Sequence, residues 1–392
     1  MTIAGVGGPV VGRPEPGDPW SAAIDLVGSA LARMGHDPEG AEAILAERGL
    51  VLSGSDDASA SASASAGVDG DADVDIQQVS ANGSCRLLRS TDGWIAVNLP
   101  RPDDLELLPA WLGPEAFTGD SADDVVPWGA IAEIVRERPG VESVERAQEL
   151  GLAVSLVPAE ARSHVDAQLL ARRTVDAGVP FVRTHVGAPV AVREPHDLRV
   201  VDLSSLWAGP LCTRLLADAG AHVIKVESTT RPDGARIGDP ALFARLHAGK
   251  EFAEVPFAPG PEGAALRELL ASADVIIEGS RPRALDRLGI DPAAVVAARP
   301  GTVWLSITAY GRTGPWRDRV GFGDDAAAAA GLLHRRPDGE PAFIGDAIAD
   351  PLTGAVAAAL VVDAVRSGGG VQLDVALREV ARSAALGVQV QW

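Results

Sequence analysis

The spacing of hydrophobic residues changes character at Leu198. From there towards the C-terminus, short apolar runs alternate with amphipathic stretches of helical length. The runs predicted as strands are 198–206, 221–228, 274–280, 302–311 and 371–377, and the stretches predicted as helices are 208–220, 261–273, 350–370 and a last segment. Because strands that alternate with helices form parallel sheets, we expect an α/β fold with a parallel sheet flanked by helices.

The first half of the chain has a different pattern. Helical spacing of apolar residues runs over 20–52, and 53–75 is a run of Ser, Ala, Asp and Gly with almost nothing to bury. Alternating apolar residues then flank Thr91-Asp92-Gly93, which predicts a β-hairpin. The predicted organisation is a helical segment at 1–52, a disordered linker at 53–78, a smaller α+β domain at 79–190, a connector at 189–195 and the α/β domain at 198–392.

The charge balance excludes some partners. The formal net charge is −20 over 392 residues, and so acidic a surface repels nucleic acid and anionic membranes. Cys85 and Cys212 are far apart and the seven histidines form no metal-binding motif, so neither a disulfide framework nor a metal site is expected. There is no signal-peptide pattern and no run of 18 apolar residues. We expect a cytoplasmic protein whose anion sites gather positive charge locally.

Asp350 stands directly before Pro351, at the start of an Ala-rich helix. Asp is a favoured N-cap residue and Pro is favoured at the first helical position, so the local sequence by itself favours a structural cap. The same place suits a nucleophile, because the positive end of the helix dipole stabilises an ionised carboxylate. Asp346 is the rival carboxylate.

Three further features could form a binding site. Arg281, Arg283 and Arg287 lie within seven positions and could hold a phosphate group or form a solvated helix start. The turn before the helix at 208–220 could hold a phosphate or be plain architecture. Tyr310 ends a predicted strand, where the edge of a site would lie. The dinucleotide, P-loop and G-x-S-x-G motifs are absent.

Five stretches together resemble a known family. They are "LRVVDLSSLWAGPLCTRLLADAGAHVIKVE", "ADVIIEGSRPRALDRLGI", "TVWLSITAYGRTGPWRD", "VGFGDDAAAAAGLL" and "FIGDAIADPLTGAVAAAL". In this order they are similar to the class III CoA-transferases, the CaiB/BaiF family, over 198 to about 385. The resemblance implies a Rossmann-like large domain, a smaller domain, and transfer of CoA between an acyl-CoA and a free carboxylic acid. Acyl-CoA would be a substrate, with no permanently bound cofactor.

The resemblance also implies roles for single residues. In the family, the catalytic Asp lies four residues before the glycine that opens the Ala-rich helix. Asp350 has this spacing to Gly354, and Asp346 does not. Asp350 would therefore carry an aspartyl-CoA thioester. The positions expected to serve the CoA site are Trp207, Ala208, Gly209, Lys225, Lys250, Arg281, Arg287 and Tyr310. Ser228 departs from an arginine common in the family, and Gly279-Ser280 departs from its Asn-Phe.

The order of the parts is unusual for this family. Stretches similar to its small domain, "CRLLRSTDGWIAVNL" and "GLAVSLVPAEARSHVDAQLLARR", come first here, which predicts a permuted member. The family's dimers are interlocked rings, so the resemblance implies a homodimer. One alternative is a catalytically inactive CoA-binding subunit, which the departures favour. A second is the family's 2-methylacyl-CoA racemase branch, which is less favoured because Phe322 stands where that branch has a His base. The sequence does not identify the acyl donor or the acid acceptor.

Overall fold

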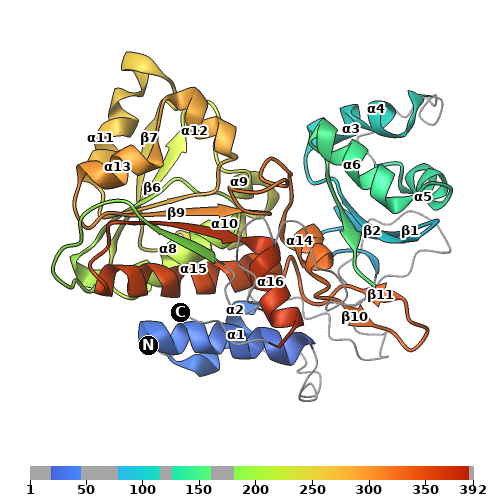
Figure 1. The fold of residues 1–392 in the computed structure, drawn as a ribbon, viewed down its shortest axis with the longest axis horizontal. Helices are drawn as coiled ribbons and strands as arrows, with labels where there is room; N and C mark the ends of the chain where they lie inside the picture. Colours follow the sequence, from blue (N-terminus) through green and yellow to red (C-terminus); the bar gives the residue numbers. More distant parts are fainter. Residues whose placement is uncertain (1–18, 46–77, 115–125, 160–180, 388–392) are drawn as a thin grey trace.

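A seven-stranded sheet is the centre of the computed structural model, which describes residues 19–45, 78–114, 126–159 and 181–387 (Figure 1). The strand order is β4-β12-β9-β8-β5-β6-β7, and every neighbouring pair is parallel except β4 with β12. The strands are β4 (Phe181–His185), β5 (Arg199–Asp202), β6 (His222–Ser228), β7 (Glu251–Val255), β8 (Val275–Glu278), β9 (Val303–Thr308) and β12 (Val371–Ala376). The predicted parallel sheet is confirmed.

Helices cover both faces of this sheet, also as predicted (Figure 1). One face packs against α1 (Pro19–Met34), α8 (Ala208–Asp218), α15 (Ala349–Arg366) and α16 (Leu377–Ala385), which share one hydrophobic core with the sheet. The other face packs against α11 (Ala264–Ser272), α12 (Pro282–Leu288) and α13 (Pro292–Ala298). The remaining helices of this part are α2 (Ala41–Leu45), α9 (Ala235–Gly238), α10 (Pro240–Leu246) and α14 (Gly323–Ala330).

The central helix α15 is almost entirely buried. It packs against α8, α1 and α16, so it has neighbours on nearly every side. A helix with apolar residues all round must be buried in this way, and the small side chains of its Ala-rich sequence allow neighbouring helices to approach closely.

A second, smaller unit precedes the large sheet in the chain. We call residues 78–114 and 126–159 the small module. Its antiparallel sheet contains β1 (Cys85–Ser90), β2 (Gly93–Asn98) and β3 (Ala153–Val157), in that order, and its helices are α3 (Pro102–Glu106), α4 (Leu108–Leu112), α5 (Trp128–Arg136) and α6 (Gly140–Leu150). Ser90 pairs with Gly93, so the predicted hairpin is confirmed. The fold class is therefore an α/β unit plus a smaller α+β unit.

Tertiary pairing redistributes two segments. The strand β4 lies within the range assigned above to the smaller domain, yet it pairs with β12 at the edge of the large sheet. The helix α1 lies in the expected N-terminal helical segment and packs into the core of the large unit. The proposed linker at 53–78 lies outside the described residues, except for Gln78.

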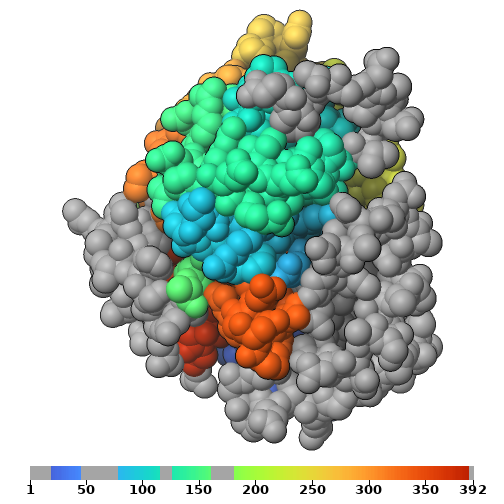
Figure 2. Space-filling model, turned by 90° about the vertical axis from the view of Figure 1, so that its right-hand side faces the viewer, coloured from blue at the N-terminus to red at the C-terminus, as the bar shows by residue number. Residues whose placement is uncertain are grey.

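The small module is packed against the large unit. The helix α14 contacts β2 and β3, and the hairpin of β10 (His334–Arg335) and β11 (Pro341–Ala342) lies below the module (Figure 2, orange). Leu87, Ala96, Ala328 and Phe343 belong to one hydrophobic cluster that spans this contact. Arg335 donates to the Pro158 carbonyl oxygen at 2.6 Å. The contact is thus packed and hydrogen-bonded.

Candidate active site

Asp350 lies in the first turn of α15 and is partly exposed. The rival carboxylate, Asp346, is only 1% exposed. The first-turn position places the Asp350 carboxylate at the positive end of an 18-residue helix. Of the two carboxylates, Asp350 therefore has the location that an external reactant could reach.

The start of α14 lies directly against this carboxylate. A Cβ atom on Gly323 would lie 2.5 Å from Asp350 Oδ2 and 2.3 Å from the Ala347 carbonyl oxygen, so only glycine fits there. The next residue, Asp324, accepts a hydrogen bond from the Ala347 main-chain nitrogen at 2.9 Å. Ala347 has a positive φ of 43°, a conformation that costs energy for a residue with a side chain.

The start of α8 meets the same place from another side. A Cβ atom on Gly354 would lie 2.7 Å from the Ala208 carbonyl oxygen, so α15 and α8 approach closely near their N-termini. Trp207 is the N-cap residue of α8, and Trp207 and Ala208 are buried. Leu206, which precedes them, has φ 71°. Among the described residues, Leu206 and Ala347 are the non-glycine residues with positive φ, and both precede these helix starts.

Three arginines lie near one another where the small module meets the carboxyl edge of the large sheet. Arg231 follows β6 and Arg281 follows β8, so both lie at the carboxyl edge of the parallel sheet, and both are exposed. Arg101 of the small module donates to the Gly151 carbonyl oxygen at 2.8 Å, and a Cβ atom on Gly151 would lie 3.9 Å from Arg281 Nη1. Desolvation, followed by the charges of Arg101 and Arg231, lowers the pKa of Arg281.

The pairing of these arginines differs. Arg101 forms an ion pair with Asp104, and its guanidinium lies 5.8 Å from the Phe322 ring, next to Gly323. Within the described ranges, Arg231 and Arg281 have no carboxylate partner. In a chain of net charge −20, unpaired arginines at a sheet's carboxyl edge are suited to bind an anion.

Lys225 and Lys250 lie in a different environment, buried beneath the β5–α8 loop. Lys225 Nζ donates to the Ser204 carbonyl oxygen and pairs with Asp233 at 3.1 Å. Lys250 Nζ donates to the Pro210 carbonyl oxygen at 2.9 Å and pairs with Asp202 at 3.2 Å. Both ammonium groups are therefore engaged within the protein and support the loop that carries Trp207, rather than lining an open surface.

This network strongly perturbs its titratable members. Asp202 also accepts from the Thr213 hydroxyl at 2.5 Å. Although burial opposes ionisation, the charges of Lys250 and Lys225 hold the pKa of Asp202 far below its usual range. Burial, with Lys250 as the next cause, lowers the pKa of His247 to about 3.

The other predicted positions are spread around the site. Arg287 is exposed near the end of α12, whose start carries Arg281. Tyr310 is 2% exposed and packs edge-on against Trp316 at 5.8 Å, so its ring lies inside the molecule rather than at an open edge. Ser280 donates its main-chain N–H to Glu278 at 2.6 Å. The structure thus brings Asp350 together with 207–209, and places Arg281 beside Arg101 and Arg231.

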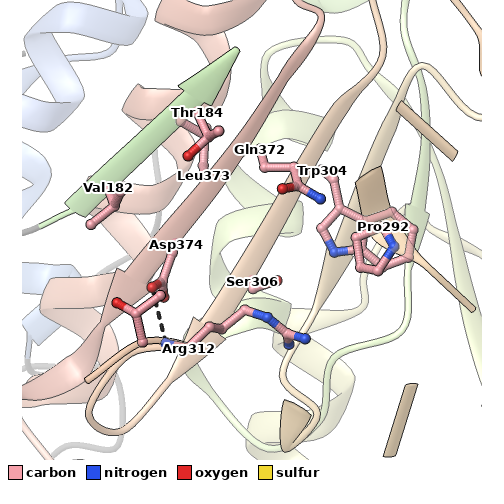
Figure 3. Close-up of a pocket in the computed structure, with 10 residues that line it drawn as sticks. Val182, Thr184, Pro292, Trp304, Ser306, Arg312, Gln372, Leu373 and Asp374 are labelled. Atoms are coloured by element: carbon pink, nitrogen blue, oxygen red, sulfur yellow. Dashed lines mark hydrogen bonds between the residues drawn. The ribbon is translucent and has the colours of Figure 1, made fainter. Parts of the chain in front are cut away.

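A separate pocket lies beside strands β4, β12 and β9 (Figure 3). It has a volume of ≈ 260 Å³ and is lined by β4, β9, β12, the start of α13 and the loop after β9. Arg312 is its cationic lining residue, and it pairs with buried Glu278 at 3.1 Å and donates its main-chain N–H to Asp374 at 2.9 Å. Because this charge is already compensated, the pocket has less positive charge to offer an anion than the site at Arg231 and Arg281.

Two classes of feature are absent from the described part of the chain. It contains no group of three or more His, Cys, Asp or Glu side chains that could hold a metal ion. Nor does any helix there have the length and apolar character needed to cross a membrane.

The family model of CoA-transferase family III matches residues 196–390. This range contains the large sheet except β4, both helix starts at Asp350, and Arg231 and Arg281. Through residues 196–390, the chain belongs to CoA-transferase family III.

Relatives match this family III chain over part of their length. A succinate–glutarate CoA-transferase of Agrobacterium fabrum is 36% identical over 213 residues, which cover 49% of this chain and 52% of the relative. A probable CoA-transferase of Mycobacterium tuberculosis is 27% identical over 356 residues, which cover 74% of this chain and 45% of the relative. The chain thus spans about half the length of these curated relatives.

A solved structure gives a similar coverage. The CaiB/BaiF family protein from Brucella suis is 33% identical, covers 49% of this chain and 55% of its own, and has a TM-score of 0.44.

Sequence reasoning did not find several residues of the candidate site. Arg101, Arg231, Gly323 and Asp324 had not been singled out, although the segment carrying Gly323 and Asp324 was recognised as a motif. Two acidic residues at the start of an Ala-rich run are a typical helix N-terminus, and this signal could have identified α14. Arg101 and Arg231 lie 130 positions apart in the sequence, so no local pattern joins them.

Proposed function

We propose that this chain is a CoA-transferase that moves CoA between an acyl-CoA and a free carboxylic acid, with Asp350 as the nucleophile. The observation that carries the proposal is the position of Asp350. It is a partly exposed carboxylate in the first turn of α15, against Gly323 and close to the start of α8, within the range that matches the family. Relatives named as CoA-transferases support the reaction class.

The first half of the reaction forms a covalent intermediate. An Asp350 carboxylate oxygen attacks the thioester carbonyl carbon of acyl-CoA and the C–S bond breaks. CoA departs as a thiolate, and Asp350 now carries the acyl group as a mixed anhydride. The thiolate then attacks the Asp350 carbonyl carbon of that anhydride. The first acid departs as a carboxylate, and an aspartyl-CoA thioester remains. The second half reverses these steps with the incoming carboxylate, so the new acyl-CoA leaves and the Asp350 carboxylate is regenerated.

The helix starts favour this chemistry electrostatically. Negative charge develops on a carbonyl oxygen at each attack, and main-chain N–H groups at helix N-termini stabilise such charge. The starts of α8, α14 and α15 all lie within the small region around Asp350. The tight contacts of Gly323 and Gly354 hold these backbones close to the reacting carboxylate.

The arginines suit the phosphate groups of CoA. We assign Arg231 and Arg281, assisted by Arg101, to phosphate binding, and assign Lys225 and Lys250 to support of the β5–α8 loop. Arg231 lies three residues after Ser228, and the two residues form a β-bridge. It therefore offers a guanidinium near the position where the family arginine is missing. Arg287 and residues 207–209 remain predicted CoA contacts.

The name of one relative suggests which acids to test first. Succinate and glutarate are dicarboxylic acids, so we infer short dicarboxylates as the first acyl and acceptor pair to test for this chain. The homodimer expected above stays a prediction of the same proposal.

A catalytically inactive CoA-binding subunit is the second candidate. The departures at Ser228, Gly279 and Ser280 favour it, as does the engagement of both lysines inside the protein. The racemase alternative is less favoured, because Phe322 has no group that could accept a proton at the position of that branch's base.

Intact-mass measurement separates these candidates. Purified protein is mixed with succinyl-CoA, glutaryl-CoA and acetyl-CoA, and the same is done with Asp350→Asn and with Asp346→Asn as the matched carboxylate control. We expect a covalent CoA or acyl adduct on the wild type and on Asp346→Asn, and none on Asp350→Asn. CoA binding without an adduct on any variant would favour the inactive subunit, and an adduct that persists on Asp350→Asn would reject Asp350 as nucleophile.

A further inference from the structure

One short turn connects the small module to Asp350. We call residues 320–325 the coupling turn. The Gln148 side chain of the small module donates to the Val320 carbonyl oxygen at 2.9 Å and accepts from the Val320 main-chain nitrogen at 2.8 Å. Three residues later, Gly323 lies against the Asp350 carboxylate. The small module therefore holds the backbone that stands against the candidate nucleophile.

Asp325 is at the centre of this connection. Its Oδ1 atom accepts from Asn98 Nδ2 of β2 at 2.9 Å and from the Phe322 main-chain nitrogen at 2.8 Å. Its main-chain oxygen accepts from the Ser155 hydroxyl of β3 at 2.9 Å. One residue thus joins two strands of the small module to the coupling turn, and its side chain is 0% exposed.

The second carboxyl oxygen of Asp325 lies in an apolar place. Among the described residues, Oδ2 has no hydrogen-bond partner, and it faces Gly321 and Ala309. The titratable groups electrostatically coupled to Asp325 are Asp324 on the same helix, Tyr310 after β9 and Cys85 on β1. None of these is a cation. Two cations act on Tyr310, and each is paired, Arg319 with Glu145 and Arg378 with Glu379. The surroundings of Asp325 therefore disfavour a charged carboxylate.

We propose that Asp325 is a positioning residue that fixes the small module to the coupling turn and so keeps Gly323 against Asp350. The catalytic part of this proposal rests on the proposed function. The structural link between the small module and the coupling turn can be tested without any turnover. The sequence position is informative, because Asp325 lies two residues after the start of α14 and its carboxyl turns back to cap that start.

The protonation state of Asp325 gives the proposal a distinctive pH dependence. Burial raises the pKa of Asp325 to about 8, so the folded protein keeps this carboxyl neutral at pH 7. In the unfolded chain an Asp titrates near ~3.9. Between about pH 4 and pH 8 the folded state therefore binds a proton that the unfolded state has lost, and stability falls as the pH rises through this window. Above about pH 8 the folded carboxyl also ionises and the coupling turn carries an uncompensated buried charge.

Hydrogen exchange tests the link directly. Asp325→Asn keeps an acceptor oxygen and is always neutral, and Asp197→Asn removes an exposed carboxylate elsewhere as a control. At each pH from 6 to 10, the exchange rate of peptides covering 320–350 is divided by the rate for Asp325→Asn, which cancels the intrinsic effect of pH. We expect this ratio to rise at least about tenfold above pH 8 for the wild type and for Asp197→Asn. A ratio that stays flat across pH 8 would overturn the proposal.

Kinetics then test the catalytic role. For an acyl-CoA that gives an adduct, kcat of the wild type should fall above pH 8, whereas kcat of Asp325→Asn should not fall there. Near pH 7 the Asn variant should keep kcat within about twofold, and Asp325→Leu should lose about tenfold or more in kcat with a smaller change in KM. If Asp325→Leu does not fold, the comparison of the pH profiles of wild type and Asp325→Asn still tests the positioning role. Equal pH profiles for wild type and Asn would reject the positioning role, whereas absence of turnover together with the expected exchange result would reject only the proposed function.

Discussion

Two pairs of cations near the carboxyl edge of the large sheet have opposite environments. Lys225 and Lys250 are buried and pair with Asp233 and Asp202, and they also donate to main-chain oxygens. Arg231 and Arg281 are exposed, and no carboxylate of the described residues pairs with them. All four lie on a strand of one sheet or within a few residues of one, so position along the chain does not separate them.

The difference teaches where this chain can receive an anion. A buried ammonium group needs its internal partners, because desolvation of an uncompensated charge is costly. An exposed guanidinium without a partner can form new charge-assisted hydrogen bonds with a phosphate at little cost. We therefore expect lysine substitutions to affect folding and arginine substitutions to affect ligand binding.

The largest expected effect is on stability. Lys250→Met removes the ammonium group that pairs with Asp202 and leaves that carboxylate buried. Removal of one member of such a buried pair lowers the free energy of unfolding by about 3–5 kcal/mol. Urea denaturation should show this loss in the free energy of unfolding, while Arg281→Met should change it by less than about 0.5 kcal/mol. A Lys250→Met protein of nearly normal stability that no longer binds CoA would instead place Lys250 in direct contact with the ligand.

The next effect is on CoA affinity. The double variant Arg231→Met/Arg281→Met should raise the Kd for CoA about 100-fold, since each guanidinium contributes a charge-assisted contact worth about tenfold. Calorimetry at two salt concentrations should also show a weaker salt dependence. Arg283→Met is the matched control, because Arg283 is exposed on the same helix as Arg281 and pairs with Asp318 at 3.3 Å. Equal losses for Arg283→Met and the double variant would contradict the assignment of a specific site.

The smallest of these effects concerns acid pH. His247 stays neutral in the folded protein because its pKa is lowered to about 3, whereas an unfolded His titrates near ~6.5. The unfolded chain therefore gains a proton first, and stability falls as the pH drops from about 6.5 towards 3. Between pH 8 and pH 5, the wild type should lose about 2 kcal/mol more stability than His247→Gln. Parallel curves of unfolding free energy against pH would show that His247 does not titrate in this window.

Much of the large unit was predictable from local patterns. The alternation of apolar runs identified five of its seven strands, because a strand buried on both faces needs a continuous apolar run. The edge strand β4 and the short strand β7 were missed. Both are edge strands, and most of their side chains are half-buried or exposed, so their sequences lack that signal.

The candidate site was predictable only in part. Asp350 could be singled out because a carboxylate before Pro at a helix start is a local feature, and the family spacing to Gly354 favoured it over Asp346. Arg101 could not be found in this way, since it is 180 positions away from Arg281 and the two approach only when the small module docks. The sequence also treated Lys250 and Arg281 alike as candidate CoA contacts, since a one-dimensional pattern does not report burial.

The sequence by itself determined the α/β class of the second half, the hairpin at 85–98, the strongly acidic net charge and a helix start close to Asp350. The helix begins at Ala349 with Ile348 as its N-cap, so Asp350 lies in the first turn and is not the predicted cap. The correct features are set by local periodicity and turn chemistry, which act over a few residues. Only the tertiary structure decided which cations are buried and which are exposed, and which turn of the large unit the small module holds. Those outcomes depend on contacts between distant segments, and they arise when packing removes one charge from water and leaves another in it.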